Sequence, residues 1–538
     1  MVSRRHPPHR PGDPTEPDAR APRPTIVWFR HDLRVTDNPA LTAAVASGGP
    51  ILPIFIWAPH EEGAWAPGAA SRWWLHHALL ALDAELGRLG NRLMVAQPMG
   101  ACETRAAAVG DGRGGGEGGG GGPPTSLGVL EALAEATGAR AVHWNRRYEP
   151  AIVARDTTIK ARLAAAGLEV QTFNASLLHE PWALRTQAGQ PFRVFTPFWR
   201  ACLAAEEPAL PLPAPRALPA LGPEMLGAAA AASGRTGLDA LGLLPAVDWA
   251  GGLRETWTPG EASARQRLGA FLSGSGPLGA YSEARDRPDQ TATSRLSAHL
   301  HFGELGPREV WRAVRAAANG RDAPKRASAD AFLRELGWRE FSHHLLFHFP
   351  TTPDRPLRPE FERFPWRSAP DDLRAWQRGR TGYPLVDAGM RELWRTGTMH
   401  NRVRMVVASF LVKHLLVPWQ AGARWFWDTL VDADLAQNTL GWQWTSGTGA
   451  DAAPYFRVFN PVLQGQKFDP QGDYVRRFVP ELAILDAAVI HAPWTCSEAE
   501  LWRAGVRLGV DYPRPIVEHA AARARALAAF HTISSRSL

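Results

Sequence analysis

Five short apolar segments alternate with helical segments in the first third of the chain, and this alternation limits the fold more than any other feature. The apolar segments are residues 25–29, 51–57, 92–97, 141–145 and 169–173, and each is typical of a buried strand. Helical stretches such as 71–90 and 127–137 separate them. A regular alternation of strand and helix predicts a doubly wound α/β domain with a parallel sheet over residues 24–175.

A glycine-rich segment, 110–124, interrupts this domain between a predicted strand and a predicted helix. A phosphate-binding loop can occupy such a place, but the segment has neither the GK[ST] ending nor the GxGxxG spacing. Because glycine loses much conformational entropy when it is ordered, we interpret the segment as a flexible surface insertion. Residues 1–23 contain arginines but no apolar core, so we expect a disordered tail there and not a signal peptide.

The strand pattern disappears in the second half of the chain. Residues 206–262 are rich in Ala, Pro, Leu and Gly with little periodicity, and we predict a long interdomain connection over residues 176–262. From 263 to 538 amphipathic helices dominate. The predicted fold class is therefore an α/β domain, a long connector and an all-helical C-terminal domain.

The charge and the cysteines limit the partners and the compartment. A formal net charge of +7 and a pI of about 9.7 are compatible with a polyanionic partner. Only four lysines are present; arginine suits bidentate phosphate contacts, although a genome-wide composition bias explains its excess equally well. Three scattered cysteines cannot hold a four-cysteine iron–sulfur cluster, so no metal site is expected. No apolar run approaches the roughly 20 residues of a membrane span, and we expect a cytoplasmic protein.

A cluster of hydroxyl groups flanks an arginine where a helix is predicted to begin. The residues are Thr293, Ser294, Arg295, Leu296 and Ser297. Helix N-termini and guanidinium groups both favour anions, so the cluster is a candidate phosphate site. The alternative is a helix N-cap next to a surface arginine.

One predicted helix carries polar and aromatic side chains on a face that should belong to the core. Phe332, Glu335, Trp338 and Arg339 share this face by their spacing. Their presence indicates either a functional surface or a structural salt bridge with the tryptophan as packing.

A second helix repeats the pattern. Asn401, Arg404 and Met405 share a face, and Arg402 lies beside them. The segment 432–444 adds two acids, an amide and two tryptophans. Polar groups that point inward from several helices predict a cavity with a polar ligand.

Six long segments of the sequence resemble DNA photolyases and cryptochromes. They are IVWFRHDLRVTDNPAL, FRVFTPFWRA, TSRLSAHLHFGELGPR, LGWREFSHHLL, TGYPLVDAGMRELWRTGTMHNRVRMVVASFLVK and LAQNTLGWQWTSGTGADAAPYFRVFNP. The resemblance runs from about residue 25 to the C-terminus and is greatest to class I cyclobutane pyrimidine dimer photolyases. It implies a Rossmann-like antenna domain, a connector and a helical domain that holds a U-shaped FAD.

The resemblance also implies which residues hold FAD. Tyr281 and residues 293–297 match those along the pyrophosphate and ribose. The rest of the flavin pocket is implied to contain Phe332, Glu335, Arg339, Asn401, Arg404, Asp432 and Asp434. Asn438 is expected to face flavin N5, where plant-type cryptochromes carry Asp and an amide can donate or accept a hydrogen bond.

The family repairs DNA by light-driven electron transfer. Reduced FAD that has absorbed light passes an electron to a pyrimidine dimer flipped out of the helix, and the electron returns after the dimer splits. Trp442, Trp419 and Trp366 match the electron relay by which the flavin is reduced, although each could instead serve only core packing. With Asn438 and Glu335, these tryptophans are the expected catalytic residues.

The lesion-binding residues are also implied by the resemblance. They are Glu335, Trp338, Arg339, Asn401, Arg402, Met405 and Trp444. Trp338 and Trp444 match the walls of the lesion pocket, and Arg402 matches a contact to the DNA backbone. (6-4) photolyases usually carry His at the position of Asn401 or Met405 for proton transfer. Both positions lack it here, which favours cyclobutane dimers, whose splitting needs no proton. We expect a monomer that binds UV-damaged DNA and no membrane.

Two further questions stay open in the sequence. Ala151 and Ile152 stand where folate-binding members carry Asn and Glu, so a folate antenna is not favoured, whereas a deazaflavin, another flavin or an empty antenna site stay open. The alternative function is a blue-light receptor of the cryptochrome type that signals through a protein partner; the absence of a long extension before Leu538 favours repair. Repair of single-stranded DNA is a third option, which the paired Trp338 and Trp444 disfavour.

Overall fold

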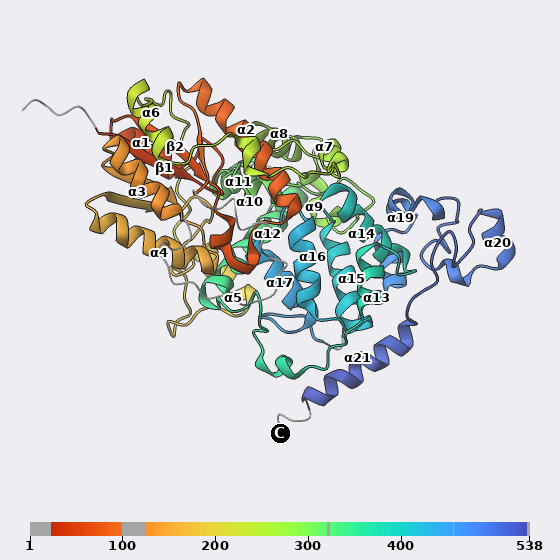
Figure 1. The fold of residues 1–538 in the computed structure, drawn as a ribbon. Helices are drawn as coiled ribbons and strands as arrows, with labels where there is room; N and C mark the ends of the chain where they lie inside the picture. Colours follow the sequence, from red (N-terminus) through yellow and green to blue (C-terminus); the bar gives the residue numbers. More distant parts are fainter. Residues whose placement is uncertain (1–22, 99–124, 320–322, 456, 535–538) are drawn as a thin grey trace, which may run out of the picture.

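The computed structural model describes residues 23–98, 125–319, 323–455 and 457–534. The predicted glycine-rich insertion and residues 1–22 of the predicted tail lie outside these ranges. Figure 1 shows an α/β domain, with α1, α3 and α4, beside a larger helical domain that contains α12 to α17. None of the helices in the described part of the chain has both the length and the apolarity of a membrane span.

The α/β domain contains a five-stranded sheet. Its strands are β1 (Thr25–Phe29), β2 (Ile51–Ile56), β3 (Met94–Ala96), β4 (Ala141–Asn145) and β5 (Glu169–Phe173). The strand order is β3-β2-β1-β4-β5 and every pair is parallel. The predicted doubly wound parallel sheet is confirmed, because short, wholly apolar runs such as 25–29 can be buried on both faces.

Helices cover both faces of this sheet. The helices are α1 (Pro39–Ala46), α2 (Ala69–Arg88), α3 (Ser126–Thr137), α4 (Pro150–Ala165) and α6 (Pro223–Ala232). Successive residues of β1 point to opposite faces. Val27 and Phe29 pack with α1 and α2, whereas Ile26 and Trp28 pack with α3, α4 and α6.

The connector contains more regular structure than its sequence indicates. It includes α5 (Phe195–Ala204), α6 and α7 (Gly251–Thr256), and α8 (Glu261–Leu272) begins at its end. Ala229 of α6 is fully buried against the sheet side of the α/β domain. The long connector therefore packs along both domains, and alanine-rich helices such as α6 give too weak an apolar pattern to be predicted.

The C-terminal domain is all-helical, as predicted. After α8 its helices are α9 (Tyr281–Ala284), α10 (Ser297–His301), α11 (Pro307–Ala318), α12 (Ala323–His348), α13 (Pro370–Gln377), α14 (Pro384–Thr396), α15 (Asn401–Ser409), α16 (Trp419–Thr429), α17 (Leu435–Ser446), α18 (Pro461–Phe468), α19 (Asp473–Phe478), α20 (Glu498–Arg503) and α21 (His519–Ser534). A π-helical turn, Phe410–His414, continues α15. Short 3-10 helices are Pro59–Trp65, Leu238–Leu241, Pro277–Ala280, Pro359–Arg363, Pro480–Leu482 and Pro493–Thr495. The largest apolar cluster lies among α14, α15, α16 and α17.

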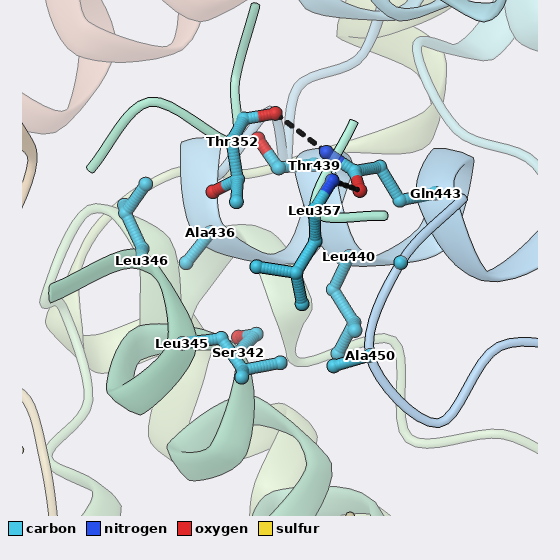
Figure 2. A pocket seen from close by; sticks show the side chains of 11 residues that line it. Ser342, Leu345, Leu346, Thr352, Leu357, Ala436, Thr439, Leu440, Gln443 and Ala450 are labelled. Carbon is cyan, nitrogen blue, oxygen red and sulfur yellow. Dashed lines mark hydrogen bonds between the residues drawn. The ribbon is translucent and has the colours of Figure 1, made fainter. Parts of the chain in front are cut away.

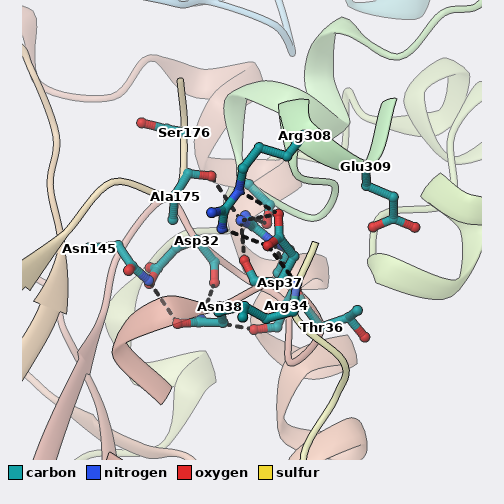
Figure 3. A network of polar contacts seen from close by, with 12 residues as sticks. Asp32, Arg34, Thr36, Asp37, Asn38, Asn145, Ala175, Ser176, Arg308 and Glu309 are labelled. Atoms are coloured by element: carbon teal, nitrogen blue, oxygen red, sulfur yellow. Dashed lines mark hydrogen bonds and ion pairs between the residues drawn. The ribbon is translucent and has the colours of Figure 1, made fainter. Parts of the chain in front are cut away.

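A buried polar network fastens the two domains together (Figure 3). Arg34, in the loop after β1, donates to the carbonyls of Gly303 and Ala175, both at 2.8 Å. Asp37 forms an ion pair with Arg308 at 2.6 Å. Gly303 has φ of 65°, and a Cβ there would lie 2.2 Å from the carbonyl oxygen of His31. This close approach requires glycine and fixes the end of α10 against the α/β domain.

Candidate functional site

Three helices of the C-terminal domain bring most of the predicted site residues together. They are α12, α15 and α17, and α17 contacts both of the others. Side chains fix where two of them begin: Asp434 accepts from the amide of Gln437 at the start of α17, and His400 accepts from the amide of Arg402 at the start of α15. The local sequence therefore determines how both helices enter the site.

Arg404 joins α15 to the loop before α17. Its Nη2 lies 3.0 and 2.9 Å from the two carboxylate oxygens of Asp432, and its Nε donates to the carbonyl of Met399 at 2.7 Å. The Asp432 side chain is 5% exposed and that of Arg404 is 25% exposed. A largely buried ion pair with further hydrogen bonds holds a fixed charge pattern in the site.

Asp434 lies between two histidines. The carboxylate is 3.3 Å from Nε2 of His343 and 3.8 Å from Nδ1 of His301. Burial acts to raise the pKa of Asp434, but the two histidines lower this pKa well below its ordinary value. Burial likewise acts to lower the pKa of His343, but Asp434 raises it overall. An aspartate anion and a histidine cation are thus the stable forms of this pair.

Asn438 lies one helical turn after Asp434. Its Nδ2 donates to the carbonyl of Ala423 at 3.0 Å, and its side chain is buried. Within the described part of the chain, its Oδ1 has no hydrogen-bond donor. The amide is therefore held on one side and has an acceptor for a ligand on the other.

Gln443 fixes α17 between the two tryptophans predicted for the relay and the lesion, Trp442 and Trp444. Its Nε2 donates to the carbonyls of Thr352 and Arg355, and its Oε1 accepts from the amide of Leu357. Figure 2 shows these side chains around a mainly apolar cavity of about 20 Å³. This cavity has room for about one water molecule and is too small for a cofactor.

The predicted phosphate cluster has unusual backbone geometry. Arg295 has φ of 53°, which is rare for a residue other than glycine. Its guanidinium lies over the ring of Trp257, 4.5 Å from the centroid. Among the described residues, the hydroxyls of Thr293, Ser294 and Ser297 have no hydrogen-bond partner. The residue that caps α10 is Leu296, without a side-chain hydrogen bond, so the N-cap alternative is wrong.

Two ion pairs lie near the residues predicted to bind the lesion. Arg285 pairs with Glu335 of α12 at 2.5 Å. Asp286 pairs with Arg402 of α15 at 2.6 Å, and the Arg402 guanidinium also lies 4.4 Å from the Phe468 ring centroid. The segment after α9 therefore bridges α12 and α15. The salt-bridge interpretation of Glu335 is confirmed, and it does not exclude ligand binding, since both pairs are partly exposed.

One face of the Trp338 indole is covered by another aromatic ring. Phe195 of α5 stacks on it with 3.8 Å between centroids and 8° between planes. This leaves the rest of the half-buried indole available to a ligand. The stacking partner is far away in sequence and fixes the orientation of the ring.

Arg339 does not lie with the other residues predicted to contact DNA. Its side chain is buried, and its Nη1 donates to the carbonyl of Ser176 in the connector. The next residue, Glu340, accepts from the amides of Leu178 and His179. The prediction that Arg339 contacts DNA directly is not supported, because the side chain has almost no exposed surface.

Burial separates part of the predicted flavin set from the predicted lesion set. Phe332, Asp432, Asp434 and Asn438, predicted for the flavin, are each at most 9% exposed. Other residues predicted for the flavin are partly exposed: Thr293, Ser294, Arg295, Ser297 and Arg404. The residues predicted for the lesion are partly or fully exposed: Glu335, Trp338, Asn401, Arg402, Met405 and Trp444. The relay shows the same gradation, since Trp442 and Trp419 are buried and Trp366 is half-buried.

His343 and His301 are polar members of the site that the sequence reasoning missed. A signal for His343 was present, because Glu335, Arg339 and His343 are spaced by four residues and share one stripe of α12. No local pattern indicated His301, whose contact with Asp434 joins segments more than a hundred residues apart.

The chain belongs to the DNA photolyase and cryptochrome family, as comparisons with known proteins show. Residues 25–216 match the family described as DNA photolyase, and residues 332–532 match the FAD binding domain of DNA photolyase.

Individual relatives show how broad the likeness is. The chain is 47% identical to a deoxyribodipyrimidine photo-lyase of Agrobacterium fabrum, over 95% of this chain and 98% of that one. It is 41% identical to cryptochrome-1 of Arabidopsis thaliana, over 93% of this chain and 69% of that one. The crystal structure of a class III photolyase from Agrobacterium tumefaciens matches with a TM-score of 0.85 and 46% identity, over 95% of this chain and 98% of that one.

The side chains present fit an FAD. The three unpaired hydroxyls of 293–297 suit phosphate and ribose oxygens, and the free Oδ1 of Asn438 suits a ring N–H. The buried pair of Arg404 and Asp432 offers both donors and an acceptor to the polar edge of a flavin ring.

Proposed function

We propose that the protein is a deoxyribodipyrimidine photo-lyase that repairs cyclobutane pyrimidine dimers in DNA with the energy of light. FAD occupies the helical domain, and the α/β domain serves as the antenna domain. The protein acts on UV-damaged DNA as a monomer in the cytoplasm.

The observation that carries the proposal is the division of the site by burial. A photolyase needs a cofactor shielded from water next to a surface that can admit an extruded pair of bases. Buried Phe332 and Asn438 and half-buried Trp338 and Trp444 lie on the same two helices, α12 and α17. Trp444 and Trp442 belong to one helix and divide between these two environments.

In this mechanism the side chains bind, orient and exclude water. Reduced FAD, when bound, would supply one electron to the dimer after absorbing light and would recover this electron once the dimer has split. Trp338 and Trp444 flank the dimer and replace the stacking lost on extrusion. Glu335 and Asn401 form hydrogen bonds to the thymine edges, and Met405 packs on the dimer.

Positive charge is provided beside the lesion. Arg402 holds a phosphate of the DNA backbone. To do so, its guanidinium either leaves the carboxylate of Asp286 or binds the carboxylate and the phosphate together. Trp366, Trp419 and Trp442 connect the protein surface with the cofactor. Asn438 would hold the edge of the flavin ring that carries N5, since the carbonyl of Ala423 fixes the orientation of its amide.

The type of lesion repaired and the photolyase class rest on different observations. Asn401 and Met405 lack the imidazole that a proton-transfer repair uses, which supports cyclobutane dimers. The likeness to a structure described as a class III photolyase supports class III, so the class I assignment predicted from the motifs stays unsupported.

The side chains at the start of α4 bear on whether the α/β domain binds folate as a second chromophore. At the start of α4, Ala151 is exposed and Ile152 is fully buried. Neither side chain can form a hydrogen bond, so a folate held there by an Asn–Glu pair is not proposed. A deazaflavin or another flavin remains the proposed alternative for an occupied antenna site.

The test is a repair assay with light and lesion as the variables. Purified protein with reduced FAD is illuminated with DNA that contains either one cyclobutane dimer or one (6-4) photoproduct. We expect the cyclobutane dimer to be converted back to intact pyrimidines under illumination and not in the dark. Bound FAD without repair of either lesion would support the cryptochrome function instead, and repair of the (6-4) substrate would overturn the proposed lesion.

A further inference from the structure

A groove lies between α5 and α12, on the side of Trp338 that faces the connector. It has a volume of about 700 Å³ and is lined by aromatic and charged side chains of both helices. The members used below are Phe195, Trp199, Arg200, Asp330, Arg334 and Trp338. A volume of this size is typical of sites for small organic ligands.

The floor of the groove is rigidly built. Phe195 stacks on Trp338 at 3.8 Å and lies nearly parallel to Trp199, with 6.3 Å between centroids. Trp199 rests directly on the backbone of α12, because a Cβ at Gly337 would lie 2.4 Å from its ring. Backbone contact thus holds Trp199, and ring stacking holds Phe195 and Trp338 against each other, as a preformed binding surface requires.

The rim of the groove offers apolar surface and positive charge. Leu203, one turn after Trp199 on α5, is 55% exposed. Arg200 of α5 and Arg334 of α12 are exposed, and within the described residues neither has a carboxylate within ion-pair distance. Asp330 is the acidic member of the lining, so the charge of the groove is positive by one: two arginines less one aspartate. Apolar surface between cationic side chains suits an unpaired base with its phosphates.

The groove is continuous with the proposed lesion pocket through Trp338, which belongs to both. When a dimer leaves the helix, the next nucleotide on the same strand loses a stacking partner. A surface that receives this nucleotide would recover part of the lost stacking energy.

We propose that this groove holds the nucleotide next to the dimer on the damaged strand. Its base packs on the apolar floor near Trp338 and Leu203, and its phosphates lie between Arg200 and Arg334. The inference rests on the proposed function, and it adds a subsite outside the lesion pocket.

The test compares dimer ligands of increasing length on the FAD-containing protein in the dark. The ligands are the bare thymine-dimer dinucleotide and trinucleotides with one nucleotide added on the 5′ or on the 3′ side. Each competes with a labelled single-stranded oligonucleotide that contains a dimer. In the parent protein we expect one of the two additions to tighten binding by about fivefold or more, the lower range of base–aromatic stacking.

The variant Arg200→Gln/Arg334→Gln should lose most of this gain and bind the bare dinucleotide within about twofold of the parent. Its binding to longer oligonucleotides should have a salt slope lower by about two, or about one for each arginine. Leu203→Glu, which places a carboxylate on the rim, should lose the gain as well. Arg378→Gln is the matched control, since Arg378 is exposed at the end of α13, and it should retain the gain.

Two results would overturn the subsite. One is a parent protein that binds the bare dinucleotide and both trinucleotides equally well. The other is a gain that survives unchanged in both groove variants. A parent that prefers none of the dimer ligands to undamaged controls would instead contradict the proposed function itself.

Discussion

The ring of Trp442 lies directly on the backbone of Gly422. A Cβ at Gly422 would be 2.1 Å from Cη2 of the indole. Trp419 precedes Gly422 by three residues and therefore lies on the same face of α16. The absence of a side chain at one position of α16 thus lets Trp442 of α17 pack against the face of α16 that carries Trp419.

Gly422→Ala should displace Trp442 and slow photoreduction of oxidised flavin. The added methyl overpacks a buried contact, which typically costs about 1–3 kcal/mol, against a gain in helix propensity of about 1 kcal/mol. We expect a lower thermal midpoint and a slower photoreduction. Gly441→Ala in α17 is the matched control, because a Cβ there meets nothing within 4 Å. Equal midpoints and rates for both variants would contradict the role of the contact.

Trp366→Phe should slow photoreduction but leave repair by chemically reduced protein unchanged. Trp366 is half-buried, with its ring centroid 4.4 Å from that of Phe364, whereas Trp442 and Trp419 are buried; its indole is therefore the part of the relay nearest to solvent. Phenylalanine preserves the packing but is much harder to oxidise. Flavin absorbance under illumination measures the first effect, and single-turnover repair measures the second. Trp502→Phe, at a tryptophan that is 79% exposed, should change neither. Unchanged photoreduction in Trp366→Phe would remove Trp366 from the relay.

Trp338→Ala should weaken the binding of dimer-containing DNA and leave FAD in place. Loss of one stacking surface is worth about 1–3 kcal/mol, or roughly five- to 150-fold in affinity. Phe195 would lose its stacking partner too, so the flavin content and thermal midpoint of the variant must be recorded with the affinity. Undamaged DNA serves as the control ligand, and an equal loss for both DNAs would argue against a lesion contact.

His343→Gln should flatten the dependence of stability on pH in the neutral and alkaline range. The pKa of His343 is raised in the folded state by Asp434, against the effect of burial. A raised histidine pKa stabilises the fold fully below the ordinary pKa of about 6.5, and this stabilisation is lost as pH rises through the folded-state pKa. Urea unfolding at several pH values should therefore show a decline in the parent over this window that is smaller in the variant. His60→Gln, at an exposed histidine, should keep the decline.

Local patterns were sufficient for the α/β domain. Four of the five strands agree with the predicted segments to within a residue, since a short, mainly apolar run such as 25–29 carries its own signal. The third strand is shorter than predicted and begins at Met94. Helix α6 was missed, because its alanine-rich sequence has no clear apolar face.

The site was predictable only in part, because half of its geometry is made by residues distant in sequence. Helical spacing placed Glu335 and Trp338 together, but it also grouped Arg339 with them. Arg339 instead binds the connector through Ser176. The role of Gly422 depends on a ring twenty positions later in another helix, and no local pattern contains that information.

The buried network around Arg34 has a consequence for how the molecule unfolds. If the α/β domain separated first, Asp37 would leave the guanidinium of Arg308, and Arg34 would lose the carbonyl of Gly303. Arg34, Asp37 and Arg308 would then lack partners or become exposed to water, and this costs free energy that neither separated domain regains. Heating should therefore give one calorimetric transition for both domains, and limited proteolysis should not release the first 175 residues as a folded fragment.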